Sequence, residues 1–197
     1  VNGKAVFEPG AERGMVFQNY SLFPWLSVQK NVEFGLSLRG MPEAQRSQRA
    51  RHFVHAVGLK GFEDAYPSHL SGGMKQRVAI ARALANDPEV LLMDGPFGAL
   101  DSQTRAVMQE LLIDIWEKNQ KTVLFVTHDI DEAVFLGDVV YVMSARPGRI
   151  IDTIPIDLPR PRQYDLVNTP EFIDIKRRIH KNLHHEVHKA LGMAGTA

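Results

Sequence analysis

Two short apolar runs that each end in a polar residue constrain the fold of this chain more than any other feature. Residues 90–93, Val-Leu-Leu-Met, are followed by Asp94, and residues 122–127, Thr-Val-Leu-Phe-Val-Thr, are followed by His128. Short continuous apolar runs are typical of parallel strands buried on both faces. Between them, residues 102–118 place apolar side chains at helical spacing. Strand, helix and strand in this order predict an α/β crossover unit in a parallel sheet.

Further strands are predicted on both sides of this unit. Residues 1–9 are expected to form a short strand and a turn, and a buried strand is expected to end at Gln18. After the unit, residues 139–144 and 150–156 flank a Pro-Gly turn and predict a hairpin. Because ligands gather at the carboxyl ends of parallel strands, we expect Gln18, Asp94 and His128 to lie at one edge of the sheet.

The stretch between Gln18 and the crossover unit contains helical patterns instead of strands. Residues 27–38 and 42–57 both predict helices, and Ser71 is expected to cap a third helix that stops near the Asp-Pro pair at 87–88. These three helices predict an α-helical subdomain inserted into the α/β core.

The chain is therefore expected to have two parts. The first is a domain over residues 1–157, with the helical subdomain at about 26–88. The second, over 158–197, consists of a linker and a carboxyl-terminal helix with an apolar stripe over 170–191. The two arginines at 158–162 are interpreted as part of a solvated linker, with a contact to anionic lipid as the lesser alternative.

Composition excludes several classes of protein. Lysine plus arginine number 23 and aspartate plus glutamate also number 23, so no overall field attracts nucleic acid or an anionic membrane. The absence of cysteine rules out disulfides and thiolate metal sites and favours a reducing compartment such as the cytoplasm. No apolar run approaches the roughly 20 residues that a membrane-spanning helix needs.

Residues 70–77, Leu-Ser-Gly-Gly-Met-Lys-Gln-Arg, are the most specific motif in the chain. Two glycines at a helix start let backbone N–H groups approach a phosphate, and the helix dipole and the Ser71 hydroxyl add favourable interactions. A capped helix after a glycine turn is the alternative interpretation. The octet resembles the signature motif of ATP-binding cassette (ABC) proteins, in which Ser71, Gly72, Gly73 and Gln76 would contact ATP held by a second subunit.

Other segments extend the resemblance in the family's order and spacing. Residues 90–94 resemble the Walker B strand, whose Asp94 would hold Mg²⁺ directly or through water. Gln18 resembles the Q-loop glutamine, which also contacts Mg²⁺, and residues 98–101 resemble the D-loop, which ends at Asp101. His128 resembles the switch histidine that senses the γ-phosphate. The resemblance implies an incomplete P-loop NTPase (RecA-like ABC cassette) core and the cofactors ATP and Mg²⁺.

Two departures from the family pattern qualify this reading. A phosphate-binding loop needs Gly-x-x-x-x-Gly-Lys-Ser/Thr, but the only Gly-Lys pair, at 3–4, is followed by alanine. In the family this Walker A loop precedes the residues that open this chain, and we expect that amino-terminal part to be missing. In addition, Gly95 stands where the family has the glutamate that polarises the attacking water. Catalytic roles then fall to Gln18, Asp101 and His128, although none of them occupies the place of that glutamate.

Three functions fit a cassette of this kind: an importer ATPase subunit, a soluble cassette that acts on nucleic acid or ribosomes, and a degenerate cassette that completes a partner's ATP site or regulates. The apolar side chains Leu22, Phe23 and Trp25 follow Gln18 closely and suit a groove that receives a helix of a membrane subunit. The neutral, compact chain lacks the basic aromatic surface of a nucleic-acid binder, and no nucleic-acid partner is expected. The first function is therefore favoured.

Within the importers, residues 11–18, 143–150 and 158–162 look like the nitrate, sulfonate and taurine group. This resemblance implies permease subunits, a second ATP-binding subunit and, indirectly, an extracytoplasmic binding protein as partners. It also implies a cytoplasmic location on the inner face of the membrane. The transported anion is not read by this subunit. Without the Walker A loop and with Gly95, the chain by itself is expected to bind ATP poorly and to hydrolyse it slowly.

Overall fold

The computed structural model describes residues 1–98 and 100–190, which form two compact units. The first unit comprises Val1–Val126 and the second begins at Thr127. The first holds a parallel sheet and a group of helices, and the described part of the second holds a hairpin, two α-helices and a 3₁₀ helix.

The sheet of the first unit has three parallel strands in the order β1 (Arg13–Val16), β2 (Val90–Asp94) and β3 (Thr122–Val126). Helix α4 (Ser102–Asn119) connects β2 to β3, which confirms the predicted α/β crossover. Leu91 and Met93 of β2 are buried, at 2% and 1% exposure. The two apolar runs thus become neighbouring strands because neither can satisfy its backbone or bury its side chains alone.

Strand β3 departs from the prediction that both of its faces are buried. Phe125 packs towards the buried ring of Phe97, with 5.7 Å between ring centroids. On the opposite face Leu124 and Val126 remain 55% and 54% exposed. Among the described residues β3 is the last strand of its sheet, so that one of its faces and its outer edge are open. A strand is buried on both faces only if other elements pack on each of them, and an apolar sequence does not show whether such elements are present.

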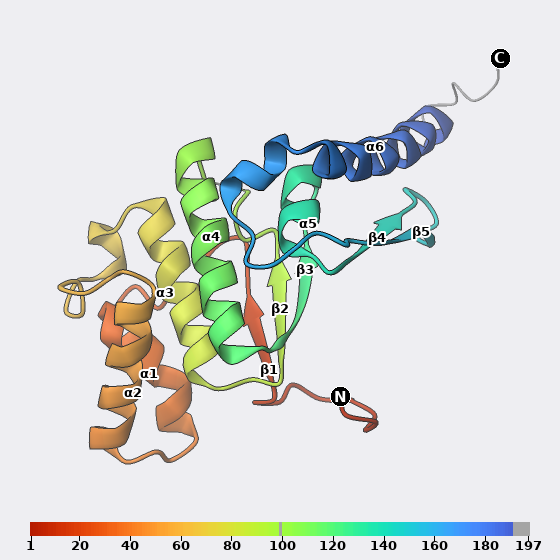
Figure 1. The fold of residues 1–197 in the computed structure, drawn as a ribbon. Coiled ribbons are helices and arrows are strands. Elements are labelled where there is room, and N and C mark those ends of the chain that lie inside the picture. The colour runs from red at the N-terminus through yellow and green to blue at the C-terminus, as the bar shows by residue number, and fades with distance from the viewer. Residues whose placement is uncertain (99, 191–197) are drawn as a thin grey trace. The chain divides into compact units, whose positions relative to one another are not determined.

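Helices α1 (Val28–Leu38), α2 (Glu43–Ala56) and α3 (Gly72–Ala85) form the predicted helical subdomain, with the short 3₁₀ helix η1 (Pro67–His69) leading into α3. Figure 1 shows the three α-helices packed together beside β1 and β2. Helix α1 begins after Ser27, whose Oγ accepts the backbone N–H of Lys30 at 3.3 Å. The core of this subdomain consists of fully or almost fully buried apolar side chains from all three helices: Val28, Val32, Leu36, Val54, Val78 and Ile80.

Residues 1–9 form turns and irregular chain, so the strand predicted there is wrong. Asn2 and Gly3 both have positive φ, of 49° and 75°, which bends the chain and lets Lys4 N–H bond Val1 O at 2.9 Å. A turn of this kind cannot continue as a strand.

The second unit consists of α5 (Ile130–Leu136), the antiparallel hairpin of β4 (Val139–Met143) and β5 (Ile150–Pro155), the 3₁₀ helix η2 (Tyr164–Asn168) and α6 (Pro170–Ala190). The predicted hairpin and long final helix are confirmed, and the predicted last residue of that helix lies outside the described residues. Ion pairs tie α6 to its neighbours: Lys176 to Asp131 of α5 at 2.6 Å, and Arg178 to Asp152 of β5 at 2.8 Å.

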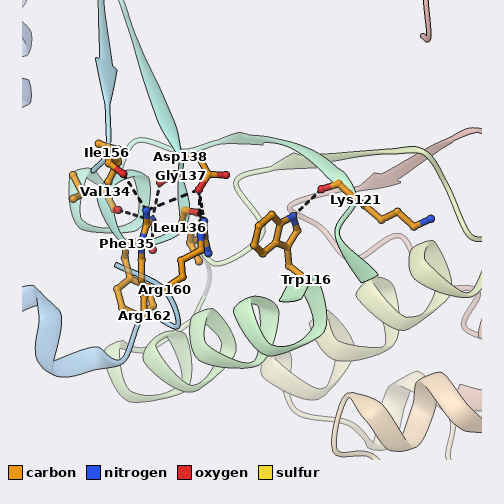
Figure 2. Close-up of polar contacts among 10 residues, drawn as sticks. All are labelled: Trp116, Lys121, Val134, Phe135, Leu136, Gly137, Asp138, Ile156, Arg160 and Arg162. Atoms are coloured by element: carbon orange, nitrogen blue, oxygen red, sulfur yellow. Dashed lines mark hydrogen bonds and ion pairs between the residues drawn. The ribbon is translucent and has the colours of Figure 1, made fainter. Parts of the chain in front are cut away.

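Arg162 is buried, at 4% exposure, which corrects the interpretation of the 158–162 segment as a solvated linker. Its Nη1 donates to the carbonyl oxygens of Val134, Phe135 and Gly137 at 3.2, 3.0 and 2.7 Å, and Nη2 donates to Ile156 O at 3.4 Å (Figure 2). The last carbonyls of a helix have no partner within it, and the dipole there favours a cation. A guanidinium satisfies both needs.

Arg160 acts at the same helix end. It pairs with Asp138 at 2.7 Å and donates to Leu136 O at 3.1 Å (Figure 2). Burial lowers the pKa of Arg162 to about 10, helped by the nearby positive charge of Arg160, while Asp138 opposes the shift. Arg162 therefore stays charged at neutral pH, and the segment is a fixed connection to α5.

Candidate functional site

The carboxyl end of β2 brings Gln18 close to the residue after Asp94. Asp94 is exposed and pairs in register with Val126 of β3. Gly95 N–H donates to Val126 O at 2.9 Å and so extends the ladder by one bond, and a turn follows in which Gly98 N–H donates to Gly95 O at 3.2 Å. A Cβ atom built on Gly95 would lie 3.8 Å from Cδ and 4.0 Å from Oε1 of Gln18. The structure thus places Gln18 beside the Asp94–Gly95 turn.

Gly95 adopts φ of +49°, in the left-handed region that glycine enters at little cost. The distances to Gln18 are ordinary van der Waals contacts, so a side chain at this position would have room. Its backbone would nevertheless be strained by about 1–2 kcal/mol. Glycine therefore suits the backbone of this turn. It provides no carboxylate at the position where the family pattern has a glutamate.

The start of α3 forms a capped, glycine-lined helix end. Ser71 Oγ accepts the N–H of Met74 at 3.3 Å, and Ser71 itself is exposed. A Cβ on Gly72 would lie 3.0 Å from the Tyr20 hydroxyl, and one on Gly73 would lie 2.7 Å from Cγ2 of Thr104. Close packing against these two side chains therefore favours glycine at both positions, whether or not a ligand binds there. The free N–H groups and the dipole of α3 make this end suitable for an anion.

Asp101 caps a helix, and Gln76 is buried. Asp101 Oδ1 accepts the N–H of Thr104 at 3.0 Å and so caps α4, and this backbone hydrogen bond lowers the pKa of the Asp101 carboxyl. Gln76 is completely buried in α3, and neither amide atom has a hydrogen-bond partner in the described part of the chain. Ala99, within the segment predicted to be the D-loop, lies outside the described residues.

His128 lies in the second unit, two residues beyond the end of β3, and its side chain is exposed. Both of its neighbours are fixed by the first turn of α5. Thr127 Oγ1 donates to Glu132 at 2.6 Å and accepts Asp129 N–H at 3.0 Å. Asp129 Oδ1 accepts the N–H groups of Asp131 and Glu132 at 2.9 and 3.2 Å. The backbone of His128 is thus held between two anchored residues.

The loop of residues 20–25, here called the docking loop, presents part of its apolar surface. Trp25 is 71% exposed, whereas Leu22 and Phe23 are half-buried. The ring of Phe23 lies 4.4 Å from that of Phe34 and 5.7 Å from that of Trp25, measured between centroids. The three predicted docking residues therefore lie in one loop, with Trp25 most accessible.

Sequence reasoning missed three residues that hold these elements. Asn31 is fully buried; its Oδ1 accepts Phe23 N–H of the docking loop at 2.8 Å, and its Nδ2 donates to the carbonyl of Leu26, just after the loop, at 2.9 Å. Arg82 binds the same loop from α3. Glu132 is 2% exposed beneath Thr127. A polar residue on the apolar face of a helix was the available signal for Asn31 and Glu132.

Comparison of the sequence with known proteins identifies relatives of this chain. Residues 2–98 match the family model described as ABC transporter. The chain is 55% identical to a nitrate import ATP-binding protein of Synechocystis, over 87% of this chain and 67% of that protein. It is 49% identical to a taurine import ATP-binding protein of Rhizobium johnstonii, with 93% and 72% covered. It is 48% identical to an aliphatic sulfonates import ATP-binding protein of Bacillus subtilis, with 91% and 68% covered.

Among solved structures, the fold is similar to the dimeric ATP-binding cassette MJ0796 in a post-hydrolysis state with ADP and phosphate. The TM-score is 0.63 and the sequences are 37% identical. The similarity covers 75% of this chain and 64% of the solved chain, so this chain spans slightly less than two thirds of that structure. The strand and helix arrangement described above is thus that of an ABC cassette core.

Proposed function

Because the chain belongs to the ATP-binding subunits of ABC transporters, in the group of nitrate, sulfonate and taurine importers, we propose that it couples ATP binding and hydrolysis to the uptake of a small anion. The observation that carries this proposal is the start of α3, where Ser71 caps a helix whose first residues are glycines packed against other elements. In this proposal that helix end faces the γ-phosphate of ATP held by a second ATP-binding subunit.

The residues at the end of β2 fit Mg²⁺. The Asp94 carboxylate and the Gln18 amide supply oxygen atoms, which are the ligands that Mg²⁺ prefers. Mg²⁺ commonly uses only one or two protein ligands and completes its shell with water and phosphate, so a pair of such residues is sufficient. We assign these two residues to Mg–ATP, and we assign to His128 of the second unit the role of sensing the γ-phosphate. Bound Mg²⁺ neutralises the charge that develops on the phosphate oxygens.

The partners in this proposal are the transmembrane permease subunits, a second ATP-binding subunit and, through the permease, an extracytoplasmic binding protein. No helix within residues 1–98 and 100–190 combines the length and the apolar character needed to cross a bilayer. Attachment to the inner face of the membrane would instead come through the docking loop, with Trp25 entering contact with a short helix of the permease.

A second candidate is a cassette that binds in the dimer but does not hydrolyse its own ATP. The turn at Gly95 favours it, because glycine has no carboxylate and so offers the attacking water no base at this position. The φ of +49° would also strain any other residue placed there. Such a chain would supply the α3 start to a competent partner and retain the docking loop.

Substitution of Ser71 tests the proposed function directly. Asp caps a helix as well as Ser does, so Ser71→Asp should keep α3 while placing a negative charge where the γ-phosphate would bind. We expect the ATP-dependent association of this chain with a second ATP-binding subunit, one that carries a phosphate-binding loop and holds the ATP, to weaken by about tenfold or more, measured by analytical ultracentrifugation with Mg–ATP. Ser71→Thr keeps the cap without the charge and is the matched control. Equal association of the Asp and Thr variants would contradict the proposal.

Trp25→Glu tests the docking surface. A charge in the centre of a desolvated contact is expected to cost roughly 2 kcal/mol or more of binding and so to abolish co-purification with the permease subunits. Phe7→Glu is the control, since Phe7 is 91% exposed, lies in the same unit and undergoes the same change of charge. If the Trp25 variant still co-purifies with the permease while circular dichroism shows an intact fold, the docking loop is not the contact.

A further inference from the structure

One arginine of α3 holds two consecutive carbonyl groups of the docking loop. Arg82 Nη1 donates to Ser21 O at 2.7 Å, and Nη2 donates to Tyr20 O at 3.1 Å. Both loop residues have positive φ, of 59° for Tyr20 and 47° for Ser21. Two successive left-handed residues expose neighbouring carbonyls, and the flat fork of a guanidinium can bind both.

This loop conformation depends on outside support. A residue other than glycine in the left-handed region is strained, and two in succession persist only where the surroundings impose the conformation. The charge-assisted hydrogen bonds from Arg82 are the interactions that reach both carbonyls. Burial lowers the pKa of Arg82 below its ordinary value, although the group remains cationic at neutral pH.

Arg82 also contacts the apolar part of the docking loop. Its guanidinium carbon lies 5.6 Å from the centroid of the Phe23 ring, within the range of a cation–π interaction. Phe23 is tethered from the other side, because Asn31 Oδ1 accepts its N–H and Asn31 Nδ2 donates to its carbonyl. The side of the loop that faces the protein is thus fixed by Arg82 and Asn31, while Trp25 faces solvent.

The same loop reaches the first residue of α3. The Tyr20 hydroxyl lies 3.0 Å from the position that a Cβ atom on Gly72 would occupy. Arg82 is on the same helix as Gly72 and binds the carbonyl of Tyr20. One side chain therefore holds the docking loop at Phe23 and fixes the residue that covers the start of α3.

We propose that Arg82 is a positioning residue that couples the docking loop to the phosphate-facing start of α3 through Tyr20. The inference rests on the proposed function, because it assigns a route between the permease contact and the ATP contact. A helix that presses on Phe23 and Trp25 would shift the guanidinium, release or tighten the two left-handed residues, and move the Tyr20 hydroxyl over Gly72.

Amide hydrogen exchange tests this connection in the chain alone, without nucleotide or permease, so its outcome is independent of the proposed function. Arg82→Lys keeps the charge but cannot bind both carbonyls at once. We expect exchange of the Phe23 and Leu26 amides, which bond Asn31 and Phe23 O, to become about tenfold faster. If coupling exists, the Met74 and Lys75 amides, which bond Ser71, should become faster as well.

Arg39→Lys is the matched control. Arg39 donates to Asn86 O at 2.7 Å beside the end of α3 and has no bond to the docking loop. This variant should leave both sets of amides unchanged. Faster exchange in the docking loop without any change at Met74 and Lys75 in Arg82→Lys would show a local structural role and overturn the proposal.

A double-mutant cycle keeps the test decisive if Arg82→Lys loosens the whole subdomain. Tyr20→Phe removes the hydroxyl over Gly72 but keeps both carbonyl bonds to Arg82, so it should quicken exchange at Met74 and Lys75 and leave Phe23 unchanged. In the Tyr20→Phe background, Arg82→Lys should then have little further effect on Met74 and Lys75. Additive effects of the two changes at these amides would contradict a route through Tyr20.

Discussion

Glutamate in place of Gly95 is expected to raise the rate of ATP hydrolysis by about 10²- to 10⁴-fold, the usual contribution of a positioned general base. The Cβ atom of the new side chain would lie 3.8 Å from the Gln18 amide carbon, an ordinary van der Waals distance, so the side chain has room to begin there. Its backbone would carry the strain of a left-handed residue, so the variant should be less stable than the parent while it is more active. The measurement is phosphate release at saturating Mg–ATP by the full gene product.

Gly95→Gln is the matched control for this experiment. Gln has the same length and the same backbone strain as Glu but no carboxylate, so it should lower stability without raising hydrolysis. A gain of similar size in both variants would show that bulk or altered backbone, and not a base, limits the parent. No gain with Glu would mean that another residue already polarises the water, and the second candidate function would lose its support.

Removal of the Arg162 side chain is expected to give the largest loss of stability. Arg162→Met keeps apolar bulk but leaves four carbonyl oxygens at the end of α5 and at Ile156 without their donor. Buried acceptors that lose their partner cost about 1–3 kcal/mol each, and the net loss should be about 3–5 kcal/mol because some will find water. The second unit should therefore unfold at lower urea concentration.

The two tryptophans make this loss measurable in one unit at a time. Trp25 and Trp116 both belong to the first unit, so their fluorescence reports that unit, whereas far-ultraviolet circular dichroism reports both. Arg162→Met should move part of the dichroism transition and leave the fluorescence transition in place. Arg160→Met, which removes one pairing with Asp138 and one with Leu136 O, should have an effect of about 1 kcal/mol. Equal effects of the two variants would contradict the assigned role of Arg162.

Local periodicity was sufficient to predict much of this fold. The apolar runs before Asp94 and His128, the helical spacing between them and the serine before two glycines each determine a strand, a helix or a cap within about 20 residues of chain. The subdomain helices and the hairpin followed for the same reason. These elements agree with the structure because their side chains bury against immediate neighbours.

Features that depend on distant segments could not be predicted in this way. Arg162 was predicted to be solvated because the carbonyl groups that bind it belong mainly to α5. Nothing in the sequence of the 158–162 segment indicates those acceptors. The role of Arg82 depends on positive φ at Tyr20 and Ser21, which neither residue type indicates. The exposure of one face of β3 likewise depends on which other elements pack on the strand, and the apolar sequence of the strand does not indicate those elements.

The pairing of β1 with β2 has a consequence for how the first unit assembles. All of α1, α2 and α3 lies between these two strands in the sequence, and closing so long a loop of unfolded chain costs about 4 kcal/mol of entropy. Helices that fold early and pack on one another shorten this loop before the strands meet. Strand β1 should therefore join the sheet late, and the contact of Gln18 with the Asp94–Gly95 turn should be among the last to form.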